Sequence, residues 1–228
     1  MKFKLLALVV LASAVTVAAC SDSTAPVTTT RLRAVHLSPD APNVNIIVNG
    51  SQVATNVAYE ASTAYYNIQS GTTRIQVQPV GTTTNAIDAS PSLLANTDYT
   101  VIAANLVASI EPLLLTDNNT PPTAGNVKVR IVHGAPSAPA VDVYITVPGV
   151  DIAVASPTLT NVSFKGVSAY QSVAAGTYQI RVTPTGTKNV VIDSGDVPLT
   201  AGQIRTVIAT DAPGGGEPFG AIVLDDLN

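Results

Sequence analysis

The chain has 228 residues, of which 46% are hydrophobic, 11% are charged and 4% are aromatic. Soluble domains usually carry roughly 25% charged residues, so Thr, Ser, Asn, Gln and Ala must cover much of this surface. The apolar content excludes intrinsic disorder, and the net charge of −4 excludes the basic surface on which nucleic-acid binding depends. A single Cys and two His exclude a disulfide framework within the chain and leave too few ligands for a catalytic zinc ion.

Residues 1–19 are predicted to be a lipoprotein signal peptide. Lys2 and Lys4 make the start positive, and the apolar run that follows is shorter than the roughly 20 residues of a membrane-spanning helix. The small residues that close this run before Cys20 resemble the lipobox of bacterial lipoproteins. The resemblance implies that the Cys20 thiol is acylated, with palmitate or a similar chain, and that Cys20 becomes the mature N-terminus. The alternative is an ordinary secretory signal with an unrelated Cys.

A lipid anchor at Cys20 would place the protein in the cell envelope. Each buried CH₂ contributes about 0.8 kcal/mol, so two or three acyl chains anchor a protein durably. Ser21 follows the Cys and, by resemblance to enterobacterial sorting, favours the outer membrane or the cell surface over the inner membrane. Residues 20–30 are small and polar and include a Pro, which predicts a flexible tether between the anchor and the fold.

The rest of the chain is an internal duplication. The segment Arg33-Ala-Val-His returns as Arg130-Ile-Val-His, and two Pro follow each copy at matching positions. Each copy is long enough to fold alone, so we predict domains at 31–116 and 127–228, joined by a linker at 117–126 that is rich in turn formers. Other residues that recur in the same order include Tyr65 and Tyr170, Ile75 and Ile180, and Thr100 and Thr206.

Both copies have the patterning of β-strands. Residues 74–78 and 179–183 alternate polar with apolar side chains, as strands with one buried face do. Turn signals such as Asn49-Gly50 recur about every ten residues, and no convincing helical stripe is found outside the signal peptide. We therefore predict an all-β fold of two tandem antiparallel β-sandwiches of the Ig-like or Greek-key type.

The first copy resembles Greek-key sandwiches in one further detail. Leu93 precedes Tyr99, which opens a strand, at a spacing similar to that of the tyrosine corner. The second copy keeps the Leu as Leu199 but has Arg205 where the Tyr would stand. We expect the corner in the first domain only.

The repeated Arg-x-Val-His-x-x-Pro-x-Ala-Pro-x-Val motif, at 33–44 and 130–141, resembles the DUF4397 family. The resemblance extends over nearly all of the chain from residue 32 onward, and it implies an extracytoplasmic domain that often occurs in tandem and on lipoproteins. The first copy departs from the family at Asn45, where the second has the usual Asp142. No catalytic residues are known for the family, so the resemblance assigns none here.

The two histidines, His36 and His133, occupy equivalent positions in the two copies. They could belong to a metal or proton-transfer site, but one His per domain is too few for zinc. The alternative is a buried His at a strand end, with its ring bonded to the stiff Pro-x-Ala-Pro loop that follows. We expect this structural role.

Three Asp residues are candidates for calcium or acid–base chemistry: Asp88 and its repeat Asp193, and Asp142. No calcium-loop spacing accompanies them, so we expect them to cap turns and expect no metal and no cofactor. The chain has no nucleophile elbow, and Gly214-Gly-Gly216 lacks the Lys and the helix of a phosphate-binding loop. We therefore do not expect an enzyme.

Tyrosines are the remaining candidates for ligand binding. Tyr65 and Tyr170 recur, which favours buried rings with bonded hydroxyls, whereas Tyr66 has no counterpart and is the better candidate for an exposed ring. We expect a non-enzymatic cell-envelope lipoprotein that displays two β-sandwiches in a structural or adhesion role. The alternative is a binding module for an envelope or extracellular glycan or peptide partner.

Overall fold

A computed structural model describes residues 28–226, which form two β-sandwiches of two small sheets each. In the first sandwich the inner sheet has the strand order β10-β9-β1-β4 and the outer sheet β3-β2-β6-β7, while β5 and β8 form a short separate pair. The strands are β1 (Thr29–Leu37), β2 (Val44–Val48), β3 (Ser51–Val57), β4 (Tyr66–Gln69), β5 (Gly71–Thr72), β6 (Ile75–Pro79), β7 (Ile87–Ala89), β8 (Ser92–Leu93), β9 (Asp98–Ala104) and β10 (Glu111–Asp117).

The second sandwich repeats this plan. Its inner sheet has the order β14-β11-β17-β18 and its outer sheet β13-β12-β15-β16. A single 3₁₀ turn, η1 (Val107–Ser109), is the only helical element of the described residues, and no helix there is long or apolar enough to cross a membrane. The strands are β11 (Asn126–His133), β12 (Val141–Thr146), β13 (Leu159–Val162), β14 (Gln171–Ala174), β15 (Gly176–Pro184), β16 (Ile192–Leu199), β17 (Ile204–Thr210) and β18 (Gly220–Asp225).

The expectation of purely antiparallel sheets is wrong. β1 pairs with β9 in parallel, and β11 pairs with β17 in parallel, although every other named strand pair is antiparallel. The chain between β1 and β9 passes through the whole outer sheet, so it returns to the inner sheet in the same direction without needing a helix as crossover. The alternation of polar and apolar residues is the same for both pairings, which is why the sequence did not reveal this.

The boundary segments differ in detail from the predicted tether and linker. β1 begins at Thr29, which pairs with Gln69, and β10 extends to Asp117, which pairs with Asp98. The predicted signal peptide and Cys20 lie outside the described residues.

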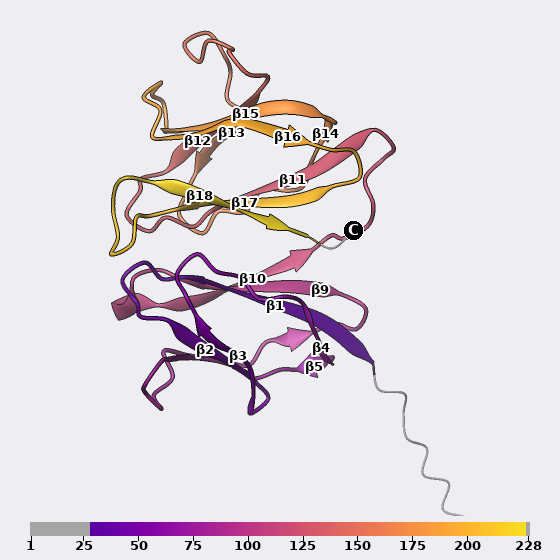
Figure 1. Ribbon diagram of the computed structural model, residues 1–228, viewed down its shortest axis with the longest axis vertical. Coiled ribbons are helices and arrows are strands. Elements are labelled where there is room, and N and C mark those ends of the chain that lie inside the picture. The colour runs from indigo at the N-terminus through magenta and orange to yellow at the C-terminus, as the bar shows by residue number, and fades with distance from the viewer. Residues whose placement is uncertain (1–27, 227–228) are drawn as a thin grey trace, which may run out of the picture.

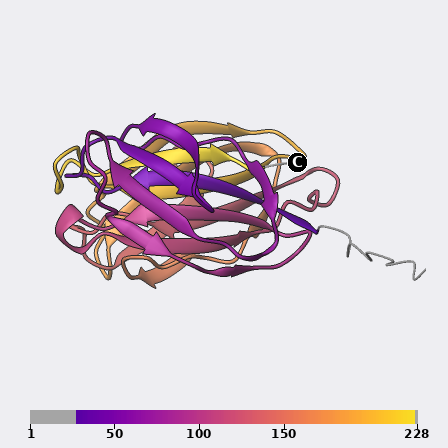
Figure 2. The same cartoon turned by 90° about the horizontal axis from the view of Figure 1, so that it is seen from below.

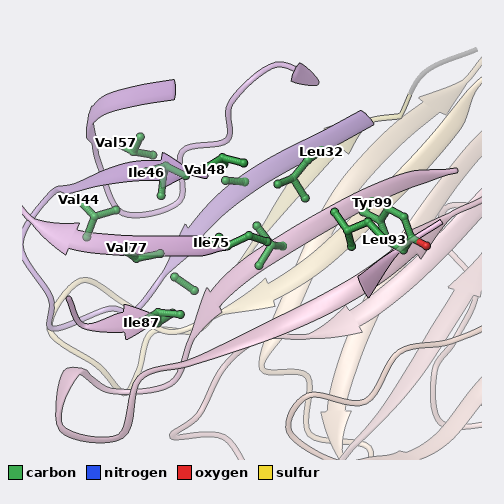
Figure 3. Packing of buried hydrophobic residues seen from close by; sticks show 13 residues of the cluster. Leu32, Val44, Ile46, Val48, Val57, Ile75, Val77, Ile87, Leu93 and Tyr99 are labelled. Atoms are coloured by element: carbon green, nitrogen blue, oxygen red, sulfur yellow. The ribbon is translucent and has the colours of Figure 1, made fainter. Parts of the chain in front are cut away.

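The core of the first sandwich contains the predicted tyrosine corner. Tyr99 is 5% exposed and packs beside Leu93 between the two sheets (Figure 3). Its hydroxyl accepts a hydrogen bond of 3.2 Å from the amide of Leu94. The Asn49-Gly50 turn between β2 and β3 is also confirmed, since both residues have the positive φ of a tight hairpin.

The two sandwiches stack with their inner sheets face to face, so that the fold has four layers (Figure 1). Seen from below, the first sandwich overlies the second along its length (Figure 2). A hydrophobic cluster between the inner sheets takes residues from both domains, and Leu37 and Val132 in it are wholly buried. Leu37 lies against Gly134, its counterpart in the repeat, because a Cβ built on Gly134 would stand 3.2 Å from Leu37 Cδ1.

Candidate functional site

A cluster of buried charges lies between the two inner sheets. Arg33 on β1 donates from Nη2 to Asp226 Oδ1 of the other sandwich at 2.6 Å, and from Nη1 to the carbonyl of Asp225 at 3.0 Å. Its Nε and Nη2 also donate to the hydroxyl of Thr100 on β9, and its guanidinium lies 4.6 Å from the ring centre of Tyr65. Contacts within the first sandwich therefore hold the Arg33 side chain, while its guanidinium group bonds to the second sandwich.

The second sandwich makes the same contacts in the opposite direction. Arg130 on β11 donates from Nη2 to Asp117 Oδ1 at 2.6 Å and from Nη1 to the carbonyl of Thr116 at 3.1 Å. Its Nε and Nη2 donate to the hydroxyl of Thr206, the counterpart of Thr100. Its guanidinium lies 4.7 Å from the ring centre of Tyr170. The two halves of the cluster are thus related by the repeat, and each Arg serves the other domain's Asp.

Each carboxylate is also held by its own domain. Asp117 Oδ2 accepts from the hydroxyls of Tyr65 and Thr100, at 2.7 and 2.6 Å. Asp226 Oδ2 accepts from Tyr170 and Thr206 at 2.9 and 2.7 Å. Buried charges are tolerated where they are paired and hydrogen-bonded, and here two cations balance two anions.

Burial of the cluster is nearly complete. The side chains of Arg33 and Arg130 are 3% and 2% exposed, and those of both aspartates are 0% exposed. The halves meet where Arg130 Nη2 lies 3.9 Å from Asp226 Oδ2. Burial raises the pKa of the Tyr65 and Tyr170 hydroxyls, and the neighbouring carboxylates of Asp117 and Asp226 raise it further. Both tyrosines therefore stay protonated and act as donors.

The structural role expected for the two histidines is confirmed. Both rings are buried, and the Nε2 atoms lie 3.2 Å from the Pro42 carbonyl and 3.0 Å from the Pro139 carbonyl, within the Pro-x-Ala-Pro loops. Burial lowers the pKa of His36. An edge-on aromatic ring covers each imidazole, Tyr59 for His36 and Phe164 for His133.

The three candidate aspartates lie apart and bond to nearby backbone or side chains. Asp88 accepts from Arg74 at 2.8 and 2.5 Å, and Asp193 accepts from Gln179. Asp142 accepts from the amides of Gly186 and Asn161, and the first of these bonds is the main cause of the lowered pKa of Asp142.

Within residues 28–226 no three His, Cys, Asp or Glu side chains lie close enough together to hold a metal ion. Asn45 replaces Asp142 in the first sandwich and keeps one of its bonds, since its Oδ1 accepts from the amide of Asn56.

Only part of the expectation for the tyrosines is met, because the side chains of Tyr65, Tyr170 and Tyr66 are all half-buried. Tyr65 and Tyr170 are committed to the interdomain cluster, with bonded hydroxyls. Tyr66 is half-buried and lines a shallow concavity beside β3, together with residues 52–58 and 61–63. Gly214 lies in a loop between β17 and β18, as expected, and its amide donates to the carbonyl of Pro39 in the first sandwich.

The charged cluster was not predicted from the sequence, although its four charged residues recur at matching positions. Arg33 and Arg130 open the repeated motif, and an Asp ends the last strand of the first copy and follows that of the second. Two Arg and two Asp that recur at matching positions in strands could have indicated a shared buried site. The sequence does not show that the two inner sheets face each other, so it does not show that these four residues meet.

Comparison with protein families gives a match to the model described as "Domain of unknown function (DUF4397)" over residues 30–144 and 145–228. The two matches together extend over most of the chain. The boundary between them falls within β12, whereas the second sandwich begins with β11. Comparison with curated proteins gives no match.

Solved structures with some likeness include the Bacillus anthracis TIE protein, at 12% identity and a TM-score of 0.26, covering 80% of this chain and 34% of that one. A leucine-rich repeat protein from Bacteroides thetaiotaomicron VPI-5482 has 12% identity and a TM-score of 0.22, with 83% and 27% covered. The family CBM26 module of Eubacterium rectale Amy13K, solved with maltoheptaose, has 11% identity and a TM-score of 0.26, with 88% and 98% covered. This chain thus spans about a third or less of the first two.

Proposed function

This chain belongs to the DUF4397 family, and from that premise we propose that it is a non-enzymatic cell-envelope lipoprotein with a structural or adhesion role. In this proposal an acyl anchor at Cys20 holds the protein at the outer membrane or the cell surface. The two sandwiches, joined through their inner sheets, act there as one rigid body.

The observation that carries the proposal is the crossed pair of buried ion pairs. Arg33 bonds Asp226 and Arg130 bonds Asp117, so the same residues of the repeated motif tie each sandwich to the other. A cluster that is satisfied by internal bonds has little capacity left for a substrate, and it fixes the relative orientation of the two domains. Rigid display of two surfaces suits a structural or adhesive part of the envelope.

The repeated histidines support the same proposal. His36 and His133 are engaged with the carbonyls of Pro42 and Pro139, and each is covered by an aromatic ring. The most distinctive polar residues of the family motif therefore have structural partners in both copies.

The anchor is tested by comparing Cys20→Ala with the matched control Ser21→Ala in membrane fractions of a bacterial host. We expect the first variant to appear in the soluble fraction and to lose labelling by a palmitate analogue, while the second stays membrane-bound and labelled. A Cys20→Ala protein that remains in the membrane fraction would contradict the lipoprotein assignment.

A second candidate, binding of a peptide or glycan, is favoured by the concavity beside edge strand β3, which Tyr66 lines. Affinity capture from the native envelope with the soluble mature chain tests both candidates. Capture that Tyr66→Ala abolishes, and that glycosidase or protease treatment of the envelope removes, would favour a dedicated binding module over a structural role. Capture that is unchanged by Tyr66→Ala favours the structural or adhesive role.

A further inference from the structure

The second sandwich encloses an apolar cavity of about 390 Å³ between its two sheets. It lies near the edge strands β16 and β18, since both contribute residues to its lining. The volume is within the roughly 300–1,000 Å³ of small-molecule sites, and apolar cavities exclude water but accept apolar ligands. Its apolar lining includes Val129, Ile131, Val143, Ile180, Val182 and Val207.

The first sandwich has apolar side chains at two positions where the second has a charged or a less buried residue. Tyr99 on β9 corresponds to Arg205 on β17, and Tyr99 is 5% exposed within the core. Leu114 on β10 and Val223 on β18 are also equivalent. Leu114 pairs with Val101 on β9, and Val223 pairs with Val207, the counterpart of Val101, on β17. Leu114 packs against the first core, whereas Val223 is 52% exposed. At these two positions the second sandwich therefore lacks apolar side chains that pack in the core of the first.

Arg205 occupies a core-facing position at the rim of the cavity. It shares the strand face of Val207 and Ala209, which belong to the second core, and its own side chain lines the cavity. Its guanidinium forms an ion pair with Asp225, whose side chain is 78% exposed. An ion pair with so exposed a partner contributes little, so the carboxylate of a ligand can replace that of Asp225. Arg is suited to this because it binds carboxylates in a bidentate way.

The opposite rim is shaped by an irregularity in β16. The register between β15 and β16 shifts between Gln179 and Arg181, and Gly195 has a φ of 60°. Ser194, which lines the cavity, accepts the amide of Ile180 at 2.8 Å. The Asp193 carboxylate at this rim is already bonded to Gln179 and to the Gly195 amide. β-Bulges are common beside functional sites, where they interrupt strand pairing.

We propose that this cavity binds a fatty acid, with the alkyl chain among the apolar side chains and the carboxylate paired with Arg205. The chemistry follows from the lining, which is apolar inside and carries a cation at the rim. This binding is separate from the proposed membrane anchor and does not depend on it.

The experiment uses the full chain carrying Cys20→Ala, so that no acyl group of its own competes for the cavity. Decanoate and decanol are titrated by calorimetry, and methyl resonances of the cavity-lining Val, Ile and Leu residues are followed by NMR. Arg205→Tyr restores the residue type of the first sandwich. Arg74→Tyr is the matched control, because Arg74 is an exposed Arg paired with Asp88 outside the cavity.

We expect saturable binding of one decanoate per chain, with decanol at least about tenfold weaker because it lacks the charge that pairs with Arg205. Arg205→Tyr should abolish binding, and Arg74→Tyr should leave it unchanged. Ala221→Phe on edge strand β18 gives an independent test that blocks the mouth without replacing the Arg. The proposal is overturned if decanoate shifts no cavity methyl resonance, if decanol binds as tightly as decanoate, or if Ala221→Phe binds like the parent.

Discussion

Arg33 and Asp226 belong to different sandwiches, yet Nη2 and Oδ1 of the two lie 2.6 Å apart in a site from which water is almost entirely excluded. The pair is repeated by Arg130 and Asp117 at the same distance. Each domain thus supplies one Arg and one Asp. Its Arg pairs with the Asp of the other domain, and its Asp pairs with the other domain's Arg. The two sandwiches are thus joined by two reciprocal buried ion pairs.

Replacing Arg33 with Met should destabilise the protein strongly. The change leaves the Asp226 carboxylate buried without its cation, and breaking a buried pair from one side costs about 3–5 kcal/mol. Urea unfolding followed by circular dichroism measures the loss as a lower midpoint. Arg130→Met should cost a similar amount, because its contacts with Asp117 are the same.

The matched control is Arg74→Met, since Arg74 and Asp88 form an ion pair of comparable length at the surface. Its side chain is 55% exposed, and solvent replaces such a pair with little change in stability. Equal effects of Arg33→Met and Arg74→Met would show that the buried cluster does not hold the sandwiches together.

Gly134→Ala should destabilise the protein by overpacking, mainly within the second sandwich, because the nearest atoms belong to Ala209 and Ile208 of that sandwich. The added Cβ would stand 2.8 Å from the carbonyl oxygen of Ala209 and 3.2 Å from Leu37 Cδ1 of the first sandwich. Overpacking of this kind costs about 1–3 kcal/mol. Thermal unfolding measures the change, and Gly176→Ala is the control because its Cβ would meet Tyr178 at an ordinary 3.7 Å. If Gly134→Ala is as stable as Gly176→Ala, the atoms of Ala209 and Leu37 do not approach Gly134 this closely.

Tyr99→Phe should destabilise the first sandwich by about 1 kcal/mol, because the Leu94 amide loses its hydrogen bond to the ring hydroxyl. Tyr178→Phe in the second sandwich is the comparison, since its hydroxyl donates to the Ala174 carbonyl at an exposed position. Chemical unfolding of both variants separates a buried corner from a surface bond. A larger loss for Tyr178→Phe would contradict the corner.

Stability should decline above pH 10. The pKa values of Tyr59, Tyr65 and Tyr170 are raised by burial, and the unfolded chain titrates its tyrosines near pH 10. Above that pH the unfolded state releases protons that the folded state retains, so the free energy of unfolding falls as pH rises. Urea midpoints measured across this range should fall more gently for the double variant Tyr65→Phe/Tyr170→Phe. An identical slope in the two proteins would mean that these hydroxyls do not stay protonated.

The repeat, the β-rich composition and the tyrosine corner were all predictable because they depend on local patterns along the chain. The role of the histidines was predictable for the same reason, since Pro42 and Pro139 lie six residues after them in sequence. The parallel pairing of β1 with β9 was not, because residue alternation is the same in either direction. The Arg33–Asp226 contact joins residues from opposite ends of the chain, and no local pattern indicates such a pair.

Differential scanning calorimetry of the whole chain tests the central claim most directly, namely that the crossed ion pairs and the shared core unite the two sandwiches. We predict a single transition whose calorimetric and van't Hoff enthalpies agree, as for one cooperative unit. Two separate transitions, or a calorimetric enthalpy about twice the van't Hoff value, would show that the sandwiches unfold independently and would contradict the claim.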